Sequence, residues 1–267
     1  MTDASQNFQT RPLSPHIGAE ITGIDVDRLD DNTFGAVRQA LFGNCMLVIR
    51  DQRLTPERQV EFSRRWGGLF VTPHLIPLPD NPYVLPVRNR GKTRTVTEHW
   101  HSDSMFAERP PAYTILHAQL LPEIGGDTMF ANQYLAYERL SPGIKRMIEG
   151  MRFSYRSSSL ANLVGEAASD GATHPIVRTH PETGRKALYL TTGQAARIEG
   201  MSDDESRLVL ELLQGKCAQP DLVYRHRWRP GDLVMWDNRC TQHYAVHDYG
   251  EHERLLHRTT VTGERPV

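Results

Sequence analysis

Short apolar and aromatic runs separated by turn residues dominate the last quarter of the chain. Three of them, at 222–228, 233–238 and 253–261, have strand length, and Pro230-Gly231-Asp232 forms a turn between the first two. Comparable runs predict further strands at 45–50, 83–87, 113–120 and 126–132, short strands within 8–29, and a hairpin at 175–190. So many short strands favour an antiparallel two-sheet barrel.

Helical patterns flank these strands. They predict helices at 34–42, 56–66, 132–140, 142–151 and 203–214. Thr55 precedes Pro56 as a cap, and Ser202 with Glu205 forms a capping box. The expected helix ends are Gly43-Asn44, Gly67-Gly68 and Gly215. We therefore expect a mainly β fold with flanking helices (α+β), the helices lying outside the barrel.

No internal repeat or linker divides the chain, so we expect one domain over 1–267. The segment 157–173 is small, polar and weakly periodic. It is a candidate lid over an active site, or equally a disordered insertion.

Net charge and cysteine content bear on which partners and which cellular compartment to expect. Thirty-one Lys and Arg face 32 Asp and Glu, which gives no support for a nucleic-acid or membrane-surface partner. No apolar run approaches the roughly 20 residues of a membrane span. The first residues, MTDASQNFQTRPL, contain no apolar run either, so we expect no signal peptide. The odd set Cys45, Cys217 and Cys240 has no CxxC pair. We expect a cytoplasmic protein without a disulfide framework.

The segment Trp100-His101-Ser102-Asp103 carries the strongest chemical signal. In a strand, residues two apart point to the same face, so His101 and Asp103 could reach one metal ion. His243, expected just past the strand at 233–238, could supply a third ligand. Two imidazoles and one carboxylate form the facial triad of non-haem iron(II) oxygenases. Taken alone, the His101-x-Asp103 pattern could be a chance match. Taken alone, His243 could be a surface or core histidine that is hydrogen-bonded to backbone.

Two arginines extend the pattern. Arg254 and Arg258 lie four apart, on one face of a predicted strand, where two cations are costly unless an anion meets them. A guanidinium grips a carboxylate through two parallel bonds, and the Thr128 hydroxyl could assist. Alternatively, the two arginines lie on an exposed strand face and form salt bridges with Glu251 or Glu253.

At these spacings the chain resembles the taurine/2,4-dichlorophenoxyacetate dioxygenase family. The resemblance runs from about residue 11 to the end. Its segments are SPHIGAEITGID, WHSDSMF, GGDTMFAN, HPIVRTHPETGRKALYL, VYRHRWRPGDLVMWDNRCTQHYAVHDY and HRTTVTGERP. It implies a double-stranded β-helix (a jelly-roll, cupin-like core) and a dioxygenase that uses Fe(II), 2-oxoglutarate and O2 and releases succinate and CO2.

The resemblance also implies roles for individual residues. His101, Asp103 and His243 match iron ligands, and Thr128 and Arg254 match the pair that holds the distal carboxylate of 2-oxoglutarate. Arg258 matches an arginine that faces the near carboxylate or the anionic head of the substrate. A small anionic organic substrate is therefore expected: an aryloxyalkanoate, alkyl sulfate, sulfonate or other carboxylate.

The substrate pocket is where the chain departs from its relatives. The residues assigned to it are Arg258, Phe70, Ser104, Gln194 and His74. Simple core packing is the alternative for Phe70, and a solvated loop position is the alternative for His74. Phe70 stands where taurine-type members carry a sulfonate-binding His, and Gln194 replaces an aromatic residue. Val96 and Thr97 align with the polar residues that meet the taurine amine. These departures argue against taurine.

Two other functions remain open: a zinc-dependent hydrolase on the same three ligands, and a non-catalytic binding module. The expected partner is the small anionic substrate, with no nucleic acid and no membrane. A homo-oligomer, either dimer or tetramer, is also expected.

Overall fold

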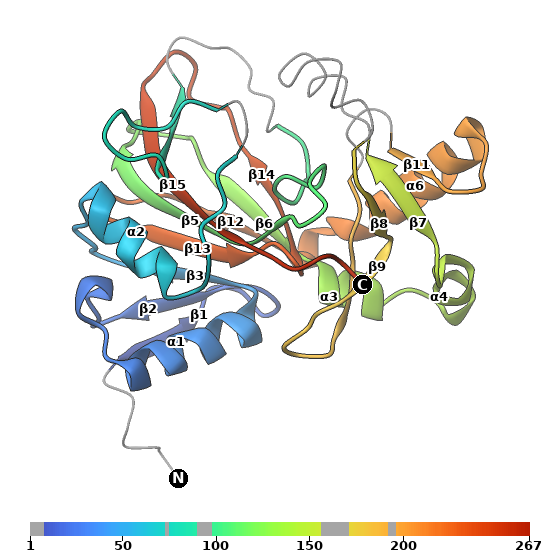
Figure 1. Ribbon diagram of the computed structural model, residues 1–267, viewed down its shortest axis with the longest axis horizontal. Helices are drawn as coiled ribbons and strands as arrows, with labels where there is room; N and C mark the ends of the chain where they lie inside the picture. Colours follow the sequence, from blue (N-terminus) through green and yellow to red (C-terminus); the bar gives the residue numbers. More distant parts are fainter. Residues whose placement is uncertain (1–7, 73–74, 90–97, 156–170, 192–195) are drawn as a thin grey trace.

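Two β-sheets form the centre of the computed structural model (Figure 1), which describes residues 8–72, 75–89, 98–155, 171–191 and 196–267. The larger sheet contains, in spatial order, β1 (Gln9–Pro12), β2 (Ala19–Thr22), β3 (Met46–Ile49), β13 (Leu233–Asp237), β5 (Pro111–Leu120), β15 (Arg254–Thr262) and β4 (Leu85–Asn89). The smaller contains β12 (Val223–His226), β6 (Thr128–Asn132) and β14 (Thr241–Ala245). Within both sheets every described pairing is antiparallel except β2 with β3.

The central strands of the larger sheet are buried on both faces. In β13, Leu233 and Met235 pack with the flanking helices, whereas Val234 and Trp236 pack with Phe130 of the smaller sheet. Because successive side chains of a strand point to opposite faces, one strand serves two apolar cores. The face that meets the smaller sheet also carries the candidate site.

Helices α1 (Asp31–Asn44) and α2 (Pro56–Arg64) cover the outer face of the larger sheet (Figure 1). The Thr55 side chain caps the start of α2, as expected, and the Asp30 side chain caps the start of α1. Their predicted ends were wrong. The first helix continues through Asn44 and stops at Cys45, whose left-handed φ of 64° ends it, and the second stops before Arg65.

A second group of elements packs beside the sheets around its own apolar cluster, which includes Ile148, Phe153, Leu210 and Leu213. Its helices are α3 (Gln133–Glu138), α4 (Pro142–Ile148) and α6 (Asp203–Cys217). Its strands are β11 (Ala196–Ile198), β7 (Arg152–Tyr155) and β8 (Thr173–Pro175), and a hairpin of β9 (Val177–Thr179) and β10 (Lys186–Leu188) adjoins them. Two 3-10 turns, η1 (Val26–Arg28) and η3 (Pro220–Leu222), complete the described elements.

Most sequence predictions for this region are confirmed. The hairpin pairs as expected, and the Ser202 and Glu205 capping box is present. Gly215 does not end α6, which runs two residues further, to Cys217, because that side chain is buried in the apolar cluster. The candidate lid at 157–173 lies mostly outside the described residues, and Thr173 already belongs to β8.

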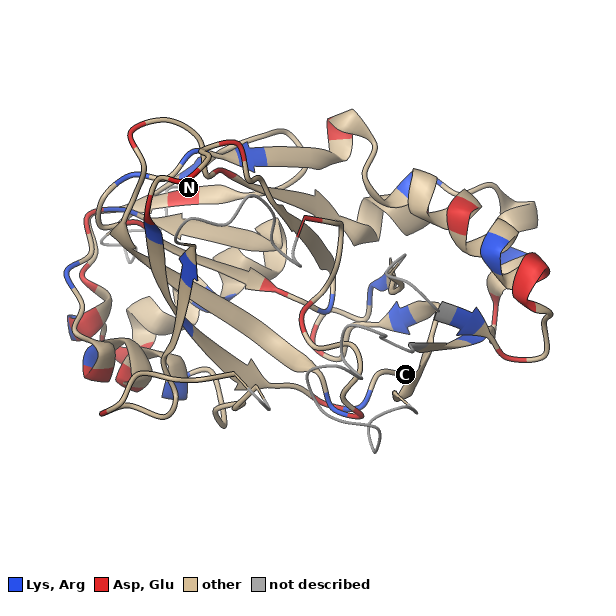
Figure 2. Cartoon of the chain, turned by 90° about the horizontal axis from the view of Figure 1, so that it is seen from above, with Lys and Arg blue, Asp and Glu red and all other residues tan. Residues whose placement is uncertain are grey.

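Charged residues of both signs are spread over the helices, strands and loops (Figure 2), and the net charge is −1. Among the described residues, no helix is long and apolar enough to cross a membrane. The expected fold class, mainly β with flanking helices around a two-sheet core, is confirmed.

A buried charge cluster joins three strands of the larger sheet. The Arg50 guanidinium donates through Nε to Glu20, at 2.6 Å, and through Nη1 to both carboxylate oxygens of Asp232, at 2.8 Å. Asp232 is fully buried and Glu20 is 8% exposed. The arginine therefore neutralises two carboxylates that would otherwise be costly to bury.

Replacing Arg50 by Met is expected to lower the free energy of unfolding by on the order of 3 kcal/mol, because two buried carboxylates lose their cation. Urea denaturation measures this loss. Arg11→Met is the control, since Arg11 also pairs with Glu20 but its side chain is 72% exposed. Its effect should stay below about 1 kcal/mol. Equal losses in the two variants would contradict this account of the cluster.

Candidate metal centre

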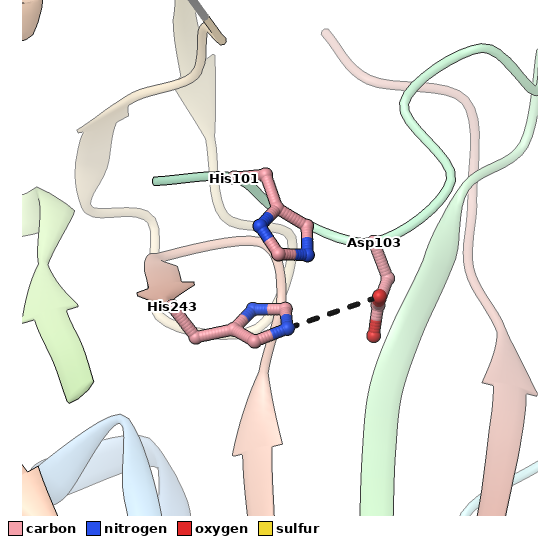
Figure 3. Close-up of side chains that lie close together, drawn as sticks. All are labelled: His101, Asp103 and His243. Carbon is pink, nitrogen blue, oxygen red and sulfur yellow. Dashed lines mark ion pairs between the residues drawn. The ribbon is translucent and has the colours of Figure 1, made fainter. Parts of the chain in front are cut away.

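His101, Asp103 and His243 converge on one point from two distant segments (Figure 3). One possible ligand atom from each lies within 4.8 Å of the others, and they form the sole such group of three or more in the described residues. The backbones of His101 and His243 exchange two hydrogen bonds, N–H to O at 3.1 and 2.8 Å. This isolated antiparallel bridge fixes the spacing of the two imidazoles, whose ring centres lie 4.1 Å apart.

The prediction that the three residues meet is correct, but the predicted local structure was wrong. His101 forms only a single bridge, and Asp103 lies in a turn instead of on the same strand. The turn is tight because Ser104 adopts a left-handed φ of 46° and its carbonyl accepts from the Ala107 N–H at 2.9 Å. His243 lies within β14 and not in a loop beyond β13.

The two imidazoles present different edges to the centre. His101 Nδ1 lies 2.8 Å from the His99 carbonyl, which can only accept, so Nδ1 carries the hydrogen and Nε2 keeps its lone pair. His243 Nε2 points toward Asp103 Oδ1 at 3.9 Å (Figure 3). Burial lowers the pKa of His101, and burial with the neighbouring His101 lowers the pKa of His243 to about 3. Both rings are therefore neutral, the form that binds metal.

Asp103 supplies the negative charge. Burial would raise the pKa of its carboxyl, but the guanidinium of Arg258 and the hydrogen bond from Thr114 lower it below its usual value. Asp103 is only 6% exposed. Two neutral imidazoles and one carboxylate are the donor set that suits a divalent ion such as iron(II).

Arg254 and Thr128 lie together, as predicted. Arg254 is 6% exposed, and its Nη2 lies 3.4 Å from Thr128 Oγ1. Its Nε has no partner, and no carboxylate of the described residues lies within ion-pair distance of the guanidinium. Burial lowers the pKa of Arg254, as expected for a buried cation without a counter-charge. A buried guanidinium beside a hydroxyl, without a carboxylate partner among the described residues, is suited to an anion.

Two residues that sequence reasoning missed shape this pair. Trp228 Nε1 donates to Thr128 Oγ1 at 3.1 Å, and the Arg254 guanidinium lies 5.5 Å from the Trp228 ring centre. Thr128 Oγ1 accepts from both neighbours, so its own hydrogen is available to a ligand. Gly126, at φ +72°, leaves room for Arg254, because a Cβ there would lie 3.0 Å from Arg254 Cδ. In the sequence, only the Gly125-Gly126-Asp127 segment before Thr128 hinted at the role of Gly126, and nothing pointed to Trp228.

Arg258 lies next to Asp103. Its Nη1 is 3.6 Å from Asp103 Oδ1, and its Nη2 donates to Thr72 Oγ1 at 3.2 Å. Phe70 is held by Thr260, two residues along β15, through bonds of 2.9 and 2.8 Å. Arg258 and Phe70 line one small pocket with Thr72, Leu75, Tyr83 and Thr260. The structure thus brings Phe70 to Arg258.

The other predicted pocket residues have different outcomes. Ser104 is described and follows Asp103 directly, in the turn. His74 and Gln194 lie outside the described residues, as do Val96 and Thr97.

Comparison with known proteins agrees with this geometry. The family described as "Taurine catabolism dioxygenase TauD, TfdA family" matches residues 9–260. An alkylsulfatase of Acinetobacter baylyi is 34% identical, over 97% of this chain and 86% of that protein. A (S)-phenoxypropionate/alpha-ketoglutarate-dioxygenase of Sphingobium herbicidovorans is 31% identical, over 97% and 96%. A crystal structure of a taurine dioxygenase from Burkholderia xenovorans superposes with a TM-score of 0.87 and 34% identity, over 98% and 93%.

Removing one of the three converging side chains should weaken metal binding. Asp103→Ala and His243→Ala are each expected to cost more Mn(II) affinity than the roughly 10- to 100-fold typical of losing an outer partner. Isothermal titration calorimetry measures the affinity, and thermal unfolding checks the fold. His257→Ala, on β15 and outside the group, is the control. Unchanged affinity in either test variant would show that the metal binds elsewhere.

Proposed function

Since the chain belongs to the TauD, TfdA family of dioxygenases, we propose that it is an iron(II)- and 2-oxoglutarate-dependent dioxygenase that hydroxylates a small anionic organic substrate. One observation carries the proposal beyond family membership. The group suited to iron(II) is linked to a buried arginine through β6: Phe130 lies opposite His243 in the register, and Thr128, two residues along the same strand, contacts Arg254. Arg254 has no carboxylate partner among the described residues. The first fits the metal and the second fits a dicarboxylate cosubstrate.

His101, Asp103 and His243 would hold the iron through His101 Nε2, His243 Nε2 and Asp103 Oδ1. Bound iron, with 2-oxoglutarate and O2, would supply the oxidation that hydroxylates the substrate while releasing succinate and CO2. The protein's part is to keep both imidazoles neutral, to keep the carboxylate ionised and to exclude competing ligands.

Arg254 and Thr128 would hold the distal carboxylate of 2-oxoglutarate. The guanidinium gives two donors in one plane, including the Nε that has no partner, and the threonine hydroxyl gives a third. Trp228 contributes by occupying an acceptor site of Thr128 Oγ1, which turns the hydroxyl hydrogen toward the ligand. Gly126 contributes by leaving the arginine its room.

The anionic head of the substrate would meet Arg258. This side chain lies next to Asp103, with its other nitrogen on Thr72, and it is 16% exposed, so it is reachable from outside. Phe70, Leu75 and Tyr83 make the adjoining wall apolar. An anion on an alkyl or aryl body suits such a wall, and the names of the alkylsulfatase and phenoxypropionate relatives describe substrates of this kind.

The two alternatives receive no support. A zinc hydrolase on these ligands would have no use for a buried Arg254 that lacks a carboxylate partner in the described part of the chain. A non-catalytic module would not need two neutral imidazoles and an ionised carboxylate held together. We further propose that the protein is a single domain in the cytoplasm, which its three free, buried cysteines support. We also propose that it assembles as a dimer or tetramer, which sedimentation analysis would test.

The proposed activity is tested with a panel of alkyl sulfates, sulfonates, aryloxyalkanoates and other carboxylates. At least one class should yield succinate above the uncoupled background, in a reaction that requires Fe(II), O2 and 2-oxoglutarate together. Succinate is quantified by chromatography. His101→Ala should abolish it, because the metal loses a ligand. Hydrolysis supported by Zn(II), with no succinate from any compound, would overturn the proposal.

Arg254→Met should raise the 2-oxoglutarate concentration needed for half-maximal succinate formation. Losing one partner of a buried charge-assisted pair costs on the order of 2–5 kcal/mol. Arg225→Met is the matched control, since this nearby arginine pairs with Asp127 and Asp248 and its side chain is 47% exposed. An unchanged cosubstrate requirement in Arg254→Met would show that a different arginine holds the carboxylate.

A further inference from the structure

We infer that Thr114 and Asn238 are positioning residues that hold Asp103 so that only its Oδ1 faces the metal. The inference rests on the proposed function and assigns roles to two residues outside the ligand set. Thr114 lies on β5, and Asn238 follows β13 directly. The two strands are hydrogen-bonded neighbours, with Trp236 opposite Thr114 in the register.

The contacts are short and enclosed. Thr114 Oγ1 donates to Asp103 Oδ2 at 2.5 Å, and Asn238 Oδ1 accepts from the Asp103 backbone N–H at 3.2 Å. Asn238 Nδ2 donates to Thr114 Oγ1 at 2.9 Å. Thr114 is 0%, Asn238 1% and Asp103 6% exposed. Water therefore has little access to replace any of these bonds.

The directions of these hydrogen bonds follow from one another. The Trp236 indole Nε1 donates at 2.9 Å to the same Asn238 oxygen that accepts the Asp103 N–H. Neither the Trp236 indole N–H nor the Asp103 backbone N–H can accept a hydrogen bond. The Asn238 amide atom that faces them is therefore its oxygen, and its nitrogen must donate to Thr114. Thr114 Oγ1 then accepts from the amide, and its single hydrogen goes to Asp103 Oδ2.

Asp103 needs such support because its own backbone offers little. It lies in a turn outside the sheets, whereas Thr114 and Trp236 belong to the larger sheet. With Oδ2 occupied by Thr114, Oδ1 is the oxygen near His243 Nε2 and Arg258 Nη1, at 3.9 and 3.6 Å. The hydrogen bonds that run from Trp236 through Asn238 and Thr114 to Asp103, called the relay below, thus fix the position of Asp103 relative to the sheet. They favour binding of the metal through Oδ1 alone.

The test uses the full-length protein and Mn(II) without cosubstrate, measured by calorimetry. Thr114→Val removes the hydroxyl at nearly constant volume and should weaken Mn(II) binding roughly 10- to 100-fold. Thr114→Ser keeps the hydroxyl and should restore affinity to within a few-fold of the parent. The absorption of bound Co(II) should change in the valine variant and not in the serine variant, because the freed carboxylate can offer both oxygens.

Thr259→Val is the matched control. Thr259 lies on the neighbouring strand, is 1% exposed, and its Oγ1 contacts Ser63 Oγ at 2.6 Å on the helix-covered face of the sheet. It should lose thermal stability as Thr114→Val does, yet bind Mn(II) like the parent. If Thr114→Val binds Mn(II) like the parent, or if Thr114→Ser is as weak as the valine variant, the inference is wrong.

Asn238→Asp gives an independent test should the valine variant fail to fold. The change keeps the oxygen that receives Trp236 and Asp103 but replaces the amide donor to Thr114 with an acceptor. The threonine hydrogen is then drawn away from Asp103. Added negative charge alone would tighten cation binding, whereas loss of the relay predicts weaker binding, so equal or tighter binding overturns the inference. A parent protein that binds no Mn(II) would instead refute the proposed function.

Discussion

The pair of backbone hydrogen bonds between His101 and His243 is the contact on which the site depends. It joins the segment before β5 to β14 of the smaller sheet, and the bonds are 3.1 and 2.8 Å long. Each imidazole is then oriented separately, His101 by the His99 carbonyl and His243 by packing against Trp236 and Phe130. Asp103 takes its place through the relay from the larger sheet. The three candidate ligands therefore derive their geometry from three different supports.

Buried arginines show how selectively this chain leaves a charge unpaired. Arg178, Arg239 and Arg254 are all buried. Arg178 pairs with Glu264, and Arg239 pairs with Asp237 and Glu264, but Arg254 has no carboxylate among the described residues. A buried charge without a partner is costly, so its retention is best explained by a ligand that completes it. This contrast makes the Arg254 site more informative than the presence of an arginine alone.

Sequence reasoning reached most strands of the two sheets, the helix starts and the meeting of the candidate ligands, because these depend on local patterns and on motif spacing. It missed β14, which it expected to be a loop. It misplaced the ends of α1, α2 and α6. At α1 a left-handed Cys45, and at α6 a buried Cys217, outweighed the glycines. It reasoned that His101 and Asp103 share a strand face, although a turn after the bridge brings them together. Trp228, Gly126 and Thr114 could not be recognised beforehand, since their roles come from strand pairings between distant segments.

Because β13 packs against the outer helices on one face and against the candidate site on the other, substitutions under the helices can affect the site. Met235 packs under the outer helices, and the next residue, Trp236, packs against His243 and bonds to Asn238. A volume change at Met235 or at the helix residues above it shifts the strand, because close-packed interiors transmit displacement. Random libraries selected for altered catalysis should therefore yield substitutions in α1 and its contacts, well removed from any bound reactant.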